Sequence, residues 1–265
     1  MTRAAGKTKK RTLLVVEGEK REPALLNCAF QAFGLDGERC IVPVCINIHA
    51  LLDILRVEYR DDYDNIDLIS ILREHFPNAS ENLSGRFTDI LLVFDFDPQD
   101  NRMRRVDLER LQRTFCDSTD MGQLYINYPA VESYRDFDCI GDVGFLGRSV
   151  SIDLCDHYKN EVGHRQNGLD DIASIDSLSF ARILGMHISK LQHILFGARV
   201  EDTVYWGRAG SIARIGLDVM EELSRLLSLE FEWLERNGEV PVCCTCLLFV
   251  CAWPDKVDAV WRKVA

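Results

Sequence analysis

The chain has 265 residues, of which 47% are hydrophobic and 28% are charged, and its formal net charge is -11. A protein that simply coats nucleic acid needs clusters of Lys and Arg to bind phosphates, so this acidic balance argues against that class. The acidic charge does not exclude a metal-dependent nuclease, because its carboxylates would bind cations and the cations would contact the substrate phosphate.

The first half of the chain alternates apolar runs with helical patterns. Residues 1–11 are basic and are predicted to form a disordered tail. Continuous apolar runs, typical of strands buried on both faces, predict strands at 12–17, 40–46, 90–97 and 123–127. Amphipathic spacing predicts the intervening helices, at 22–33, 49–58, 65–75 and 101–116, with a short helix from about Ala130. This alternation predicts an α/β fold with a mostly parallel sheet flanked by helices.

The pattern changes after residue 137. Four segments read as helical, at 150–161, 170–175, 178–196 and 211–236. The last apolar run predicts a strand at about 240–250 that returns to the first sheet. We therefore expect an α/β core over 12–137 and a mainly helical region over 138–265 with that final strand.

The ten cysteines bear on compartment and metal binding. The segment Cys243–Cys251 reads CCTCLLFVC, and the sequence has no second CxxC pair and no HxxxH pair to complete a zinc site, so burial in the core is favoured over a zinc or redox site. The apolar run near the N-terminus is too short for a signal peptide, which favours a cytoplasmic protein with reduced thiols. The longest apolar stretch, 240–253, is shorter than the roughly 20 residues of a membrane span, so no membrane association is expected.

Acidic residues follow three of the predicted strands. Glu17 ends the first, Asp95 and Asp97 end the third, and Glu132 lies just beyond the fourth. Ligands of open α/β sheets bind at the carboxyl ends of parallel strands, so these carboxylates are expected to converge. Asp95 and Asp97 would point to the same side if the strand continued that far. Such a cluster favours Mg²⁺ or Mn²⁺, although each acid taken alone is as well explained as a turn former or a helix cap.

Four basic residues are weaker candidates. Lys20 and Arg102 stand next to the acidic motifs and would contact a substrate phosphate, with solvated surface charge as the alternative. His187 and Lys190 share a face of the predicted 178–196 helix and would stabilise a leaving oxygen, although a packed histidine is the commoner case.

The sequence motifs resemble those of a known family. VVEGEKREP, at 15–23, resembles the first motif of Toprim domains, in which a Glu ends the first strand before a Gly, and LLVFDFDPQD, at 91–100, resembles their Asp-x-Asp motif. EGEKxEP with the later YPAVES resembles motifs of RloB-like and OLD-like Toprim proteins of bacterial phage defence. Arg21 stands where the RloB motif usually has Thr, and Val131 where its later segment usually has Phe. The resemblance covers about residues 12–135.

The resemblance implies a Mg²⁺- or Mn²⁺-dependent endonuclease that hydrolyses phosphodiester bonds of RNA or DNA in antiphage defence. Glu17 would act as the acid/base or metal-bridging carboxylate, Asp95 and Asp97 would be metal ligands, and Glu132 an additional catalytic acid. Gly18 would allow a sharp backbone turn beneath the metal. The acidic charge suggests that a defence-system protein or a homodimer supplies a basic groove for the nucleic acid.

Two other functions compete with the nuclease. One is a non-catalytic interaction subunit with a degenerate Toprim fold, which would not need the retained carboxylates. The other is a small-molecule phosphotransferase, which is disfavoured because the sequence contains no Gly-rich phosphate loop of the Walker or Rossmann type.

Overall fold

The structure is a computed structural model that describes residues 11–35, 37–60, 62–77, 83–203 and 219–263. Nearly all of the predicted basic tail, and the first part of the helix predicted at 211–236, lie outside the described residues. The chain forms an α/β fold in which one continuous apolar core joins the sheet to the C-terminal helices.

A five-stranded sheet forms the centre of the fold, in the order β2-β1-β3-β5-β4. All neighbouring strands are parallel except β4, which runs antiparallel along the edge beside β5. The prediction of a mostly parallel sheet is confirmed, and the four parallel strands are the four that the apolar runs predict. The strands are β1 (Arg11–Val16), β2 (Glu38–Pro43), β3 (Asp89–Asp95), β4 (Cys116–Asp117) and β5 (Gly122–Asn127).

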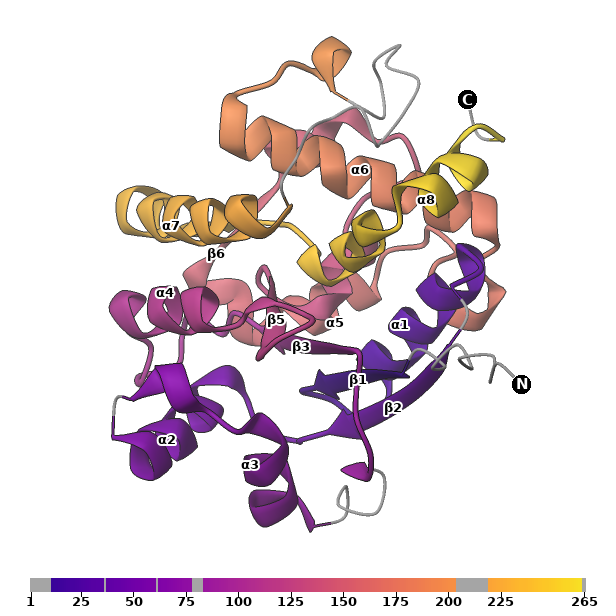
Figure 1. The fold of residues 1–265 in the computed structure, drawn as a ribbon. Helices are drawn as coiled ribbons and strands as arrows, with labels where there is room; N and C mark the ends of the chain where they lie inside the picture. The colour runs from indigo at the N-terminus through magenta and orange to yellow at the C-terminus, as the bar shows by residue number, and fades with distance from the viewer. Residues whose placement is uncertain (1–10, 36, 61, 78–82, 204–218, 264–265) are drawn as a thin grey trace, which may run out of the picture.

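Helices connect the parallel strands and cover the two faces of the sheet. In Figure 1, α1 lies on one side of β1 and β2, whereas α2 and α3 lie on the other. Their apolar stripes face the strands; Leu51, Leu52 and Leu55 of α2, for example, are buried. These connecting helices are α1 (Arg21–Ala32), α2 (Ile48–Tyr59), η1 (Tyr63–Asn65), α3 (Leu68–His75) and α4 (Arg105–Thr114).

The strand order creates a switch point between β1 and β3. From β1 the chain moves outward to β2, and it then crosses back to the other side of β1 to form β3. The connections that leave the carboxyl ends of β1 and β3 therefore diverge, and ligands of open α/β sheets usually bind at such a switch point.

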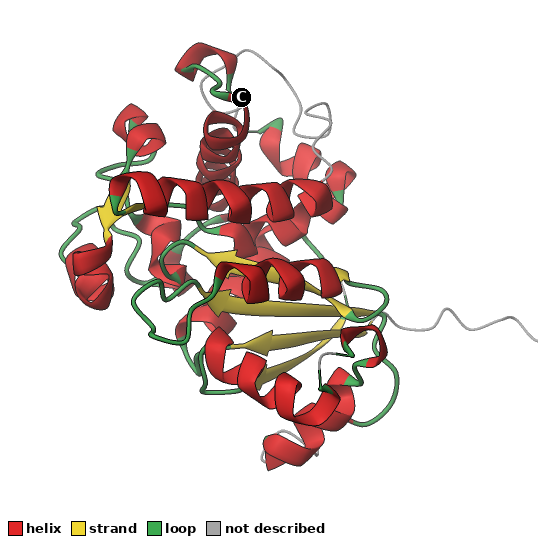
Figure 2. Cartoon of the chain, turned by 90° about the vertical axis from the view of Figure 1, so that its left-hand side faces the viewer, coloured by secondary structure: helices red, strands yellow, loops and turns green. Residues whose placement is uncertain are grey.

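The C-terminal half is helical and packs over the sheet (Figure 2). The long helix α6 contacts α1, α7 and α8, and α7 also contacts α4. The elements of this half are η3 (Val131–Arg135), η4 (Val143–Gly147), β6 (Ser149–Ser151), η5 (Ile152–His157), α5 (Tyr158–Gly163), η6 (Ile172–Ser174), α6 (Ser177–Phe196), η7 (Val200–Asp202), α7 (Val219–Asn237), β7 (Glu239–Pro241), η9 (Thr245–Ala252) and α8 (Pro254–Trp261). Among the helices that the structure describes, none is long and apolar enough to cross a bilayer.

The prediction of a long returning strand at 240–250 is wrong. β7 has three residues and pairs antiparallel with β6 in a separate two-stranded sheet. A single bridge, between Tyr128 and Cys243, links this segment to the end of β5. Pro241 lacks the N–H that a longer ladder would need. Beyond it, η9 binds the end of β5 through side chains: Thr245 Oγ1 donates to the Ile126 carbonyl at 2.7 Å.

The cysteine segment lies in the core, and the described cysteines are free thiols. Cys243, Cys244 and Cys246 are fully buried. The Asn127 side-chain oxygen, at the end of β5, accepts from the Cys246 backbone N–H at 3.1 Å and from the Cys244 thiol at 3.5 Å. These contacts fix the C-terminal half against the carboxyl end of β5.

Glu230 of α7 is fully buried, and neither carboxylate oxygen has a hydrogen-bond partner among the described residues. Burial raises the pKa of Glu230 well above 4.5, although Lys190 opposes the shift. Above pH 4.5 the unfolded chain releases the Glu230 proton, whereas the folded protein retains it. The free energy of unfolding therefore falls as the pH rises from 4.5 towards the pKa of Glu230 in the folded protein. We expect Glu230→Gln to remove that loss.

Urea unfolding at pH 5 and pH 7.5 measures the effect of Glu230→Gln. The free energy of unfolding of the unmodified protein should fall between these pH values by more than about 1 kcal/mol relative to the variant. Burial lowers the pKa of Lys190 to about 8, so that group titrates above this window. Glu232→Gln, on the same helix but 40% exposed, is the matched control. Parallel pH profiles for all three proteins would contradict the prediction.

Candidate active site

The carboxyl ends of β1 and β3 bring Glu17 and Asp95 together. Glu17 follows the last residue of β1, and its backbone N–H donates to the Val93 carbonyl of β3 at 3.1 Å. Its carboxylate oxygen Oε2 then accepts from the Asp95 backbone N–H, also at 3.1 Å. Two residues 78 positions apart thus meet at the switch point of the sheet.

Asp95 is the last residue of β3 and is completely buried. Its Oδ1 accepts from the Val131 backbone N–H at 2.8 Å, and its Oδ2 accepts from the Lys159 ammonium at 2.7 Å. Each carboxylate oxygen therefore has a partner, one from the start of η3 and one from α5.

Asp97 does not lie beside Asp95 in the way that strand alternation predicts. The strand ends at Asp95, where the Phe96 backbone N–H is shared between the carbonyl of Asn127, the last residue of β5, and that of Pro129 beyond it. Asp97 then adopts a left-handed backbone conformation with φ of 46°, which is costly for a residue with a side chain. It remains close enough for its charge to act on Glu17.

Glu132 lies on η3 and is 7% exposed. Its Oε1 is 3.8 Å from Nε of Arg21, and its Oε2 has no hydrogen-bond partner among the described residues. Its charge acts on Asp95 and on Glu22, so it belongs to the same cluster.

Glu22 is a fifth carboxylate, which the sequence reasoning treated only as part of a helix start. It lies in the first turn of α1, is 4% exposed, and accepts hydrogen bonds from backbone N–H groups, including that of Gly18. Gly18 does not adopt a positive φ, although the chain bends at residues 17, 19 and 20. A Cβ at residue 18 would instead lie 2.6 Å from the Glu22 carboxylate. A side chain at residue 18 would therefore force the Glu22 carboxylate to move.

Lys159 of α5 was also missed by the sequence reasoning. It follows Asp95 by 64 residues and lies in a short helix with no motif around it, so no local pattern pointed to it. Its ammonium acts on Glu17, Glu22 and Asp97 as well as on Asp95. It is the internal counter-ion of the carboxylate cluster.

Burial and mutual repulsion make the carboxylates of this cluster hard to ionise. Burial raises the pKa of Glu17, and repulsion from Asp95 and Asp97 raises it further. Burial likewise raises the pKa values of Asp95, Asp97 and Glu22, with Lys159 opposing each shift. For Lys159 itself, burial lowers the pKa, but the attraction of Asp95 outweighs it and the net shift is upward. The cluster would be relieved by additional positive charge.

The chemistry of these side chains fits a divalent cation. Mg²⁺ and Mn²⁺ prefer carboxylate oxygens, and the buried, unpartnered Oε2 of Glu132 is available as a donor. The carboxylate oxygens of the cluster do not, however, already lie as close together as the ligands of one ion. In the described part of the chain, three ligand atoms lie within 4.8 Å of one another only at Glu58, Glu74 and His75, a surface group with two exposed glutamates. Glu17, Asp95 and Asp97 would have to draw closer around an ion.

Residues that follow β2 contact the acids that follow β3. The Asn47 side chain donates to Asp100 at 2.9 Å and also hydrogen-bonds Asp97. His49, at the start of α2, is 1% exposed, and neither ring nitrogen has a hydrogen-bond partner among the described residues. Its charge, when present, would act on Asp97 and Asp100.

The predicted phosphate-binding residues differ in their surroundings. Lys20 is exposed at the start of α1. Arg102 is engaged by neighbouring side chains of the protein. Its guanidinium donates to Asp100 at 2.6 Å and to Asn47 at 3.1 Å, and it lies 3.4 Å from Asp53. Arg102 therefore organises the loop after β3, and its hydrogen bonds hold the pKa of Asp100 well below the usual range.

The structure gives His187 and Lys190 structural contacts, the commoner of the two alternatives considered for the histidine. His187 is fully buried; its Nδ1 accepts from the Cys244 backbone N–H at 3.1 Å, and burial lowers its pKa to about 3. The Lys190 ammonium donates to three backbone carbonyls, those of Phe145, Leu146 and Arg148, at 2.6–3.3 Å. Both side chains hold the backbone around α6 in place.

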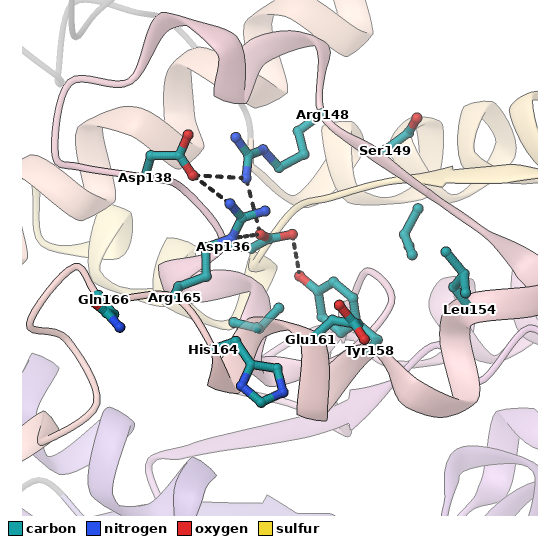
Figure 3. Close-up of a pocket in the computed structure, with 12 residues that line it drawn as sticks. Asp136, Asp138, Arg148, Ser149, Leu154, Tyr158, Glu161, His164, Arg165 and Gln166 are labelled. Carbon is teal, nitrogen blue, oxygen red and sulfur yellow. Dashed lines mark hydrogen bonds and ion pairs between the residues drawn. The ribbon is translucent and has the colours of Figure 1, made fainter.

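A pocket of about 620 Å³ lies along α5 (Figure 3). Asp136 stands at its centre and is 4% exposed. It accepts from Arg165 at 2.7 Å, from the Tyr158 hydroxyl at 3.1 Å and from Arg148 at 3.3 Å. Asp138 pairs with the same two arginines but is 70% exposed. This network anchors the helix that carries Lys159.

The fold and the site together define an α/β protein with a buried carboxylate cluster at the switch point of a mostly parallel sheet. Comparison of the chain with protein-family models, with curated proteins and with solved structures found no match. The function is therefore argued from the site itself and from the motifs.

Proposed function

We propose that this protein is a Toprim-type nuclease that uses Mg²⁺ or Mn²⁺ to hydrolyse phosphodiester bonds of RNA or DNA. The observation that carries the proposal is the hydrogen bond between the Glu17 carboxylate and the Asp95 backbone, at the carboxyl edge of two adjacent parallel strands. The proposed role as an effector in bacterial antiphage defence rests on the resemblance of the motifs.

Glu17, Asp95 and Asp97 would hold the cation. When bound, it would polarise a phosphodiester oxygen and lower the pKa of the attacking water. Glu17 is suited to proton transfer, because burial and its acidic neighbours raise its pKa. Glu132, which keeps one buried oxygen unpaired, would accept a hydrogen bond from substrate or water. Lys20 is the better candidate for phosphate contact, because Arg102 is already engaged by Asp100.

A second candidate function is a non-catalytic subunit that binds a defence-system protein. One observation favours it: Lys159 already supplies a positive charge at Asp95, as a protein that has dispensed with the metal would require. The other carboxylates favour the nuclease, since Lys159 at Asp95 and Arg21 at Glu132 supply two positive charges for five acids.

Incubation of the purified chain with single- and double-stranded RNA and DNA separates these functions. Cleavage of at least one substrate class that requires Mg²⁺ or Mn²⁺ and stops with EDTA is expected. Absence of cleavage from the whole panel, at protein concentrations up to those of the substrate, would favour the non-catalytic subunit.

A further inference from the structure

Lys159 is bound to a carboxylate oxygen of Asp95, a residue that would hold the proposed cation. The Lys159 ammonium lies 2.7 Å from Oδ2 of Asp95, while Oδ1 accepts from the Val131 backbone N–H. A divalent cation on Asp95 would bind at about 2.1 Å from a carboxylate oxygen. The ammonium and the cation would then share one oxygen at close range, and their like charges would repel.

The two ends of the Lys159 side chain differ in their freedom to move. Its helix is held in place, because the neighbouring Tyr158 is buried and its hydroxyl donates to Asp136 (Figure 3). The Lys159 side chain itself is 52% exposed, whereas that of Asp95 is 1% exposed. A lysine stem is long and flexible. The ammonium can therefore leave Asp95 for solvent without any movement of α5.

The surroundings of Lys159 also favour its return. Glu17 and Glu132, together with Asp95, attract the ammonium. In the absence of a metal, Lys159 is thus the group that neutralises the most buried carboxylate of the cluster.

We propose that Lys159 is an internal competitor of the divalent cation: its ammonium holds Asp95 until the cation displaces it. The inference rests on the proposed metal site and adds a regulatory property to it. Lys159 sets the cation concentration at which the site fills, and it keeps the carboxylates together while the site is free of metal.

Calorimetric titration with Mn²⁺ tests this proposal. Lys159→Met keeps the length of the stem and removes the charge, and Lys256→Met, at an exposed lysine of α8, is the matched control. We expect Lys159→Met to bind Mn²⁺ at least about tenfold more tightly than the unmodified protein and than Lys256→Met. Asp95→Asn in the Lys159→Met background should abolish this binding, which separates the site from weak binding to the acidic surface.

The outcomes distinguish the competitor from the metal site itself. Equal or weaker binding by Lys159→Met, with the unmodified protein still binding through Asp95, would overturn the competitor and leave the proposed nuclease standing. Failure of every variant to bind Mn²⁺ would overturn both.

Thermal unfolding with and without Mn²⁺ provides a second readout, and Lys159→Gln replaces the methionine variant if that variant does not fold. The rise in Tm caused by Mn²⁺ should be larger in the lysine variant than in the unmodified protein. An equal rise would count against the competitor.

Discussion

Replacement of Asp95 by asparagine is expected to reduce metal-dependent cleavage by about 10³-fold or more. Asparagine keeps an oxygen that can accept from the Val131 backbone N–H, so the local fold should survive. It removes the charge that would hold the cation. Lewis-acid stabilisation contributes several kcal/mol to such reactions, and each 1.36 kcal/mol corresponds to a factor of ten in rate.

The initial rate of cleavage of the best substrate, at saturating Mn²⁺, measures the effect of Asp95→Asn. Asp89→Asn is the matched control, because Asp89 is the first residue of the same strand and lies at the opposite edge of the sheet. It should cleave at the unmodified rate. A rate for Asp95→Asn within about tenfold of the control would show that the nuclease does not use this cluster, and the scaffold function would then be preferred.

The parallel strands and the approach of Glu17 to Asp95 could be predicted from sequence. Strands buried on both faces appear as continuous apolar runs, as in Leu13–Val16, and such runs are distinctive. Parallel strands end at a common edge, so acids that follow them must lie near one another whatever their separation in sequence. For that reason Glu17 and Asp95 could be paired before any coordinates were known.

Other parts of the site could not be predicted, for separate physical reasons. The position of Asp97 depends on where β3 ends and on the left-handed backbone conformation of Asp97 itself, and no local sequence pattern predicts either. Lys159 reaches Asp95 from a helix whose placement is purely tertiary. The apolar run after Pro241 predicts a strand but forms the helical turns of η9. A segment buried on all sides has no periodicity that distinguishes the two structures.

Asp136→Ala is expected to destabilise the protein by about 3 kcal/mol. The substitution leaves the buried Tyr158 hydroxyl and the Arg165 Nε without their acceptor, and it removes one of the acceptors of Arg148. Removing one partner of a buried ion pair costs about 3–5 kcal/mol. The lower end of that range applies because Arg148 retains Asp142 at 3.1 Å and the Arg165 side chain is 31% exposed. In a chain of this size the loss corresponds to a fall in Tm of about 6–12 °C.

Asp138→Ala is the control for Asp136→Ala, because Asp138 pairs with the same arginines but is 70% exposed. Exposed ion pairs contribute about 0–1 kcal/mol, so this variant should unfold within about 3 °C of the unmodified protein. Equal losses in the two variants would mean that the charge of the arginines matters and the buried anchor does not. A large loss confined to Asp136→Ala would show that the buried Asp136 carboxylate, through Tyr158 and Arg165, holds α5 in place together with Lys159.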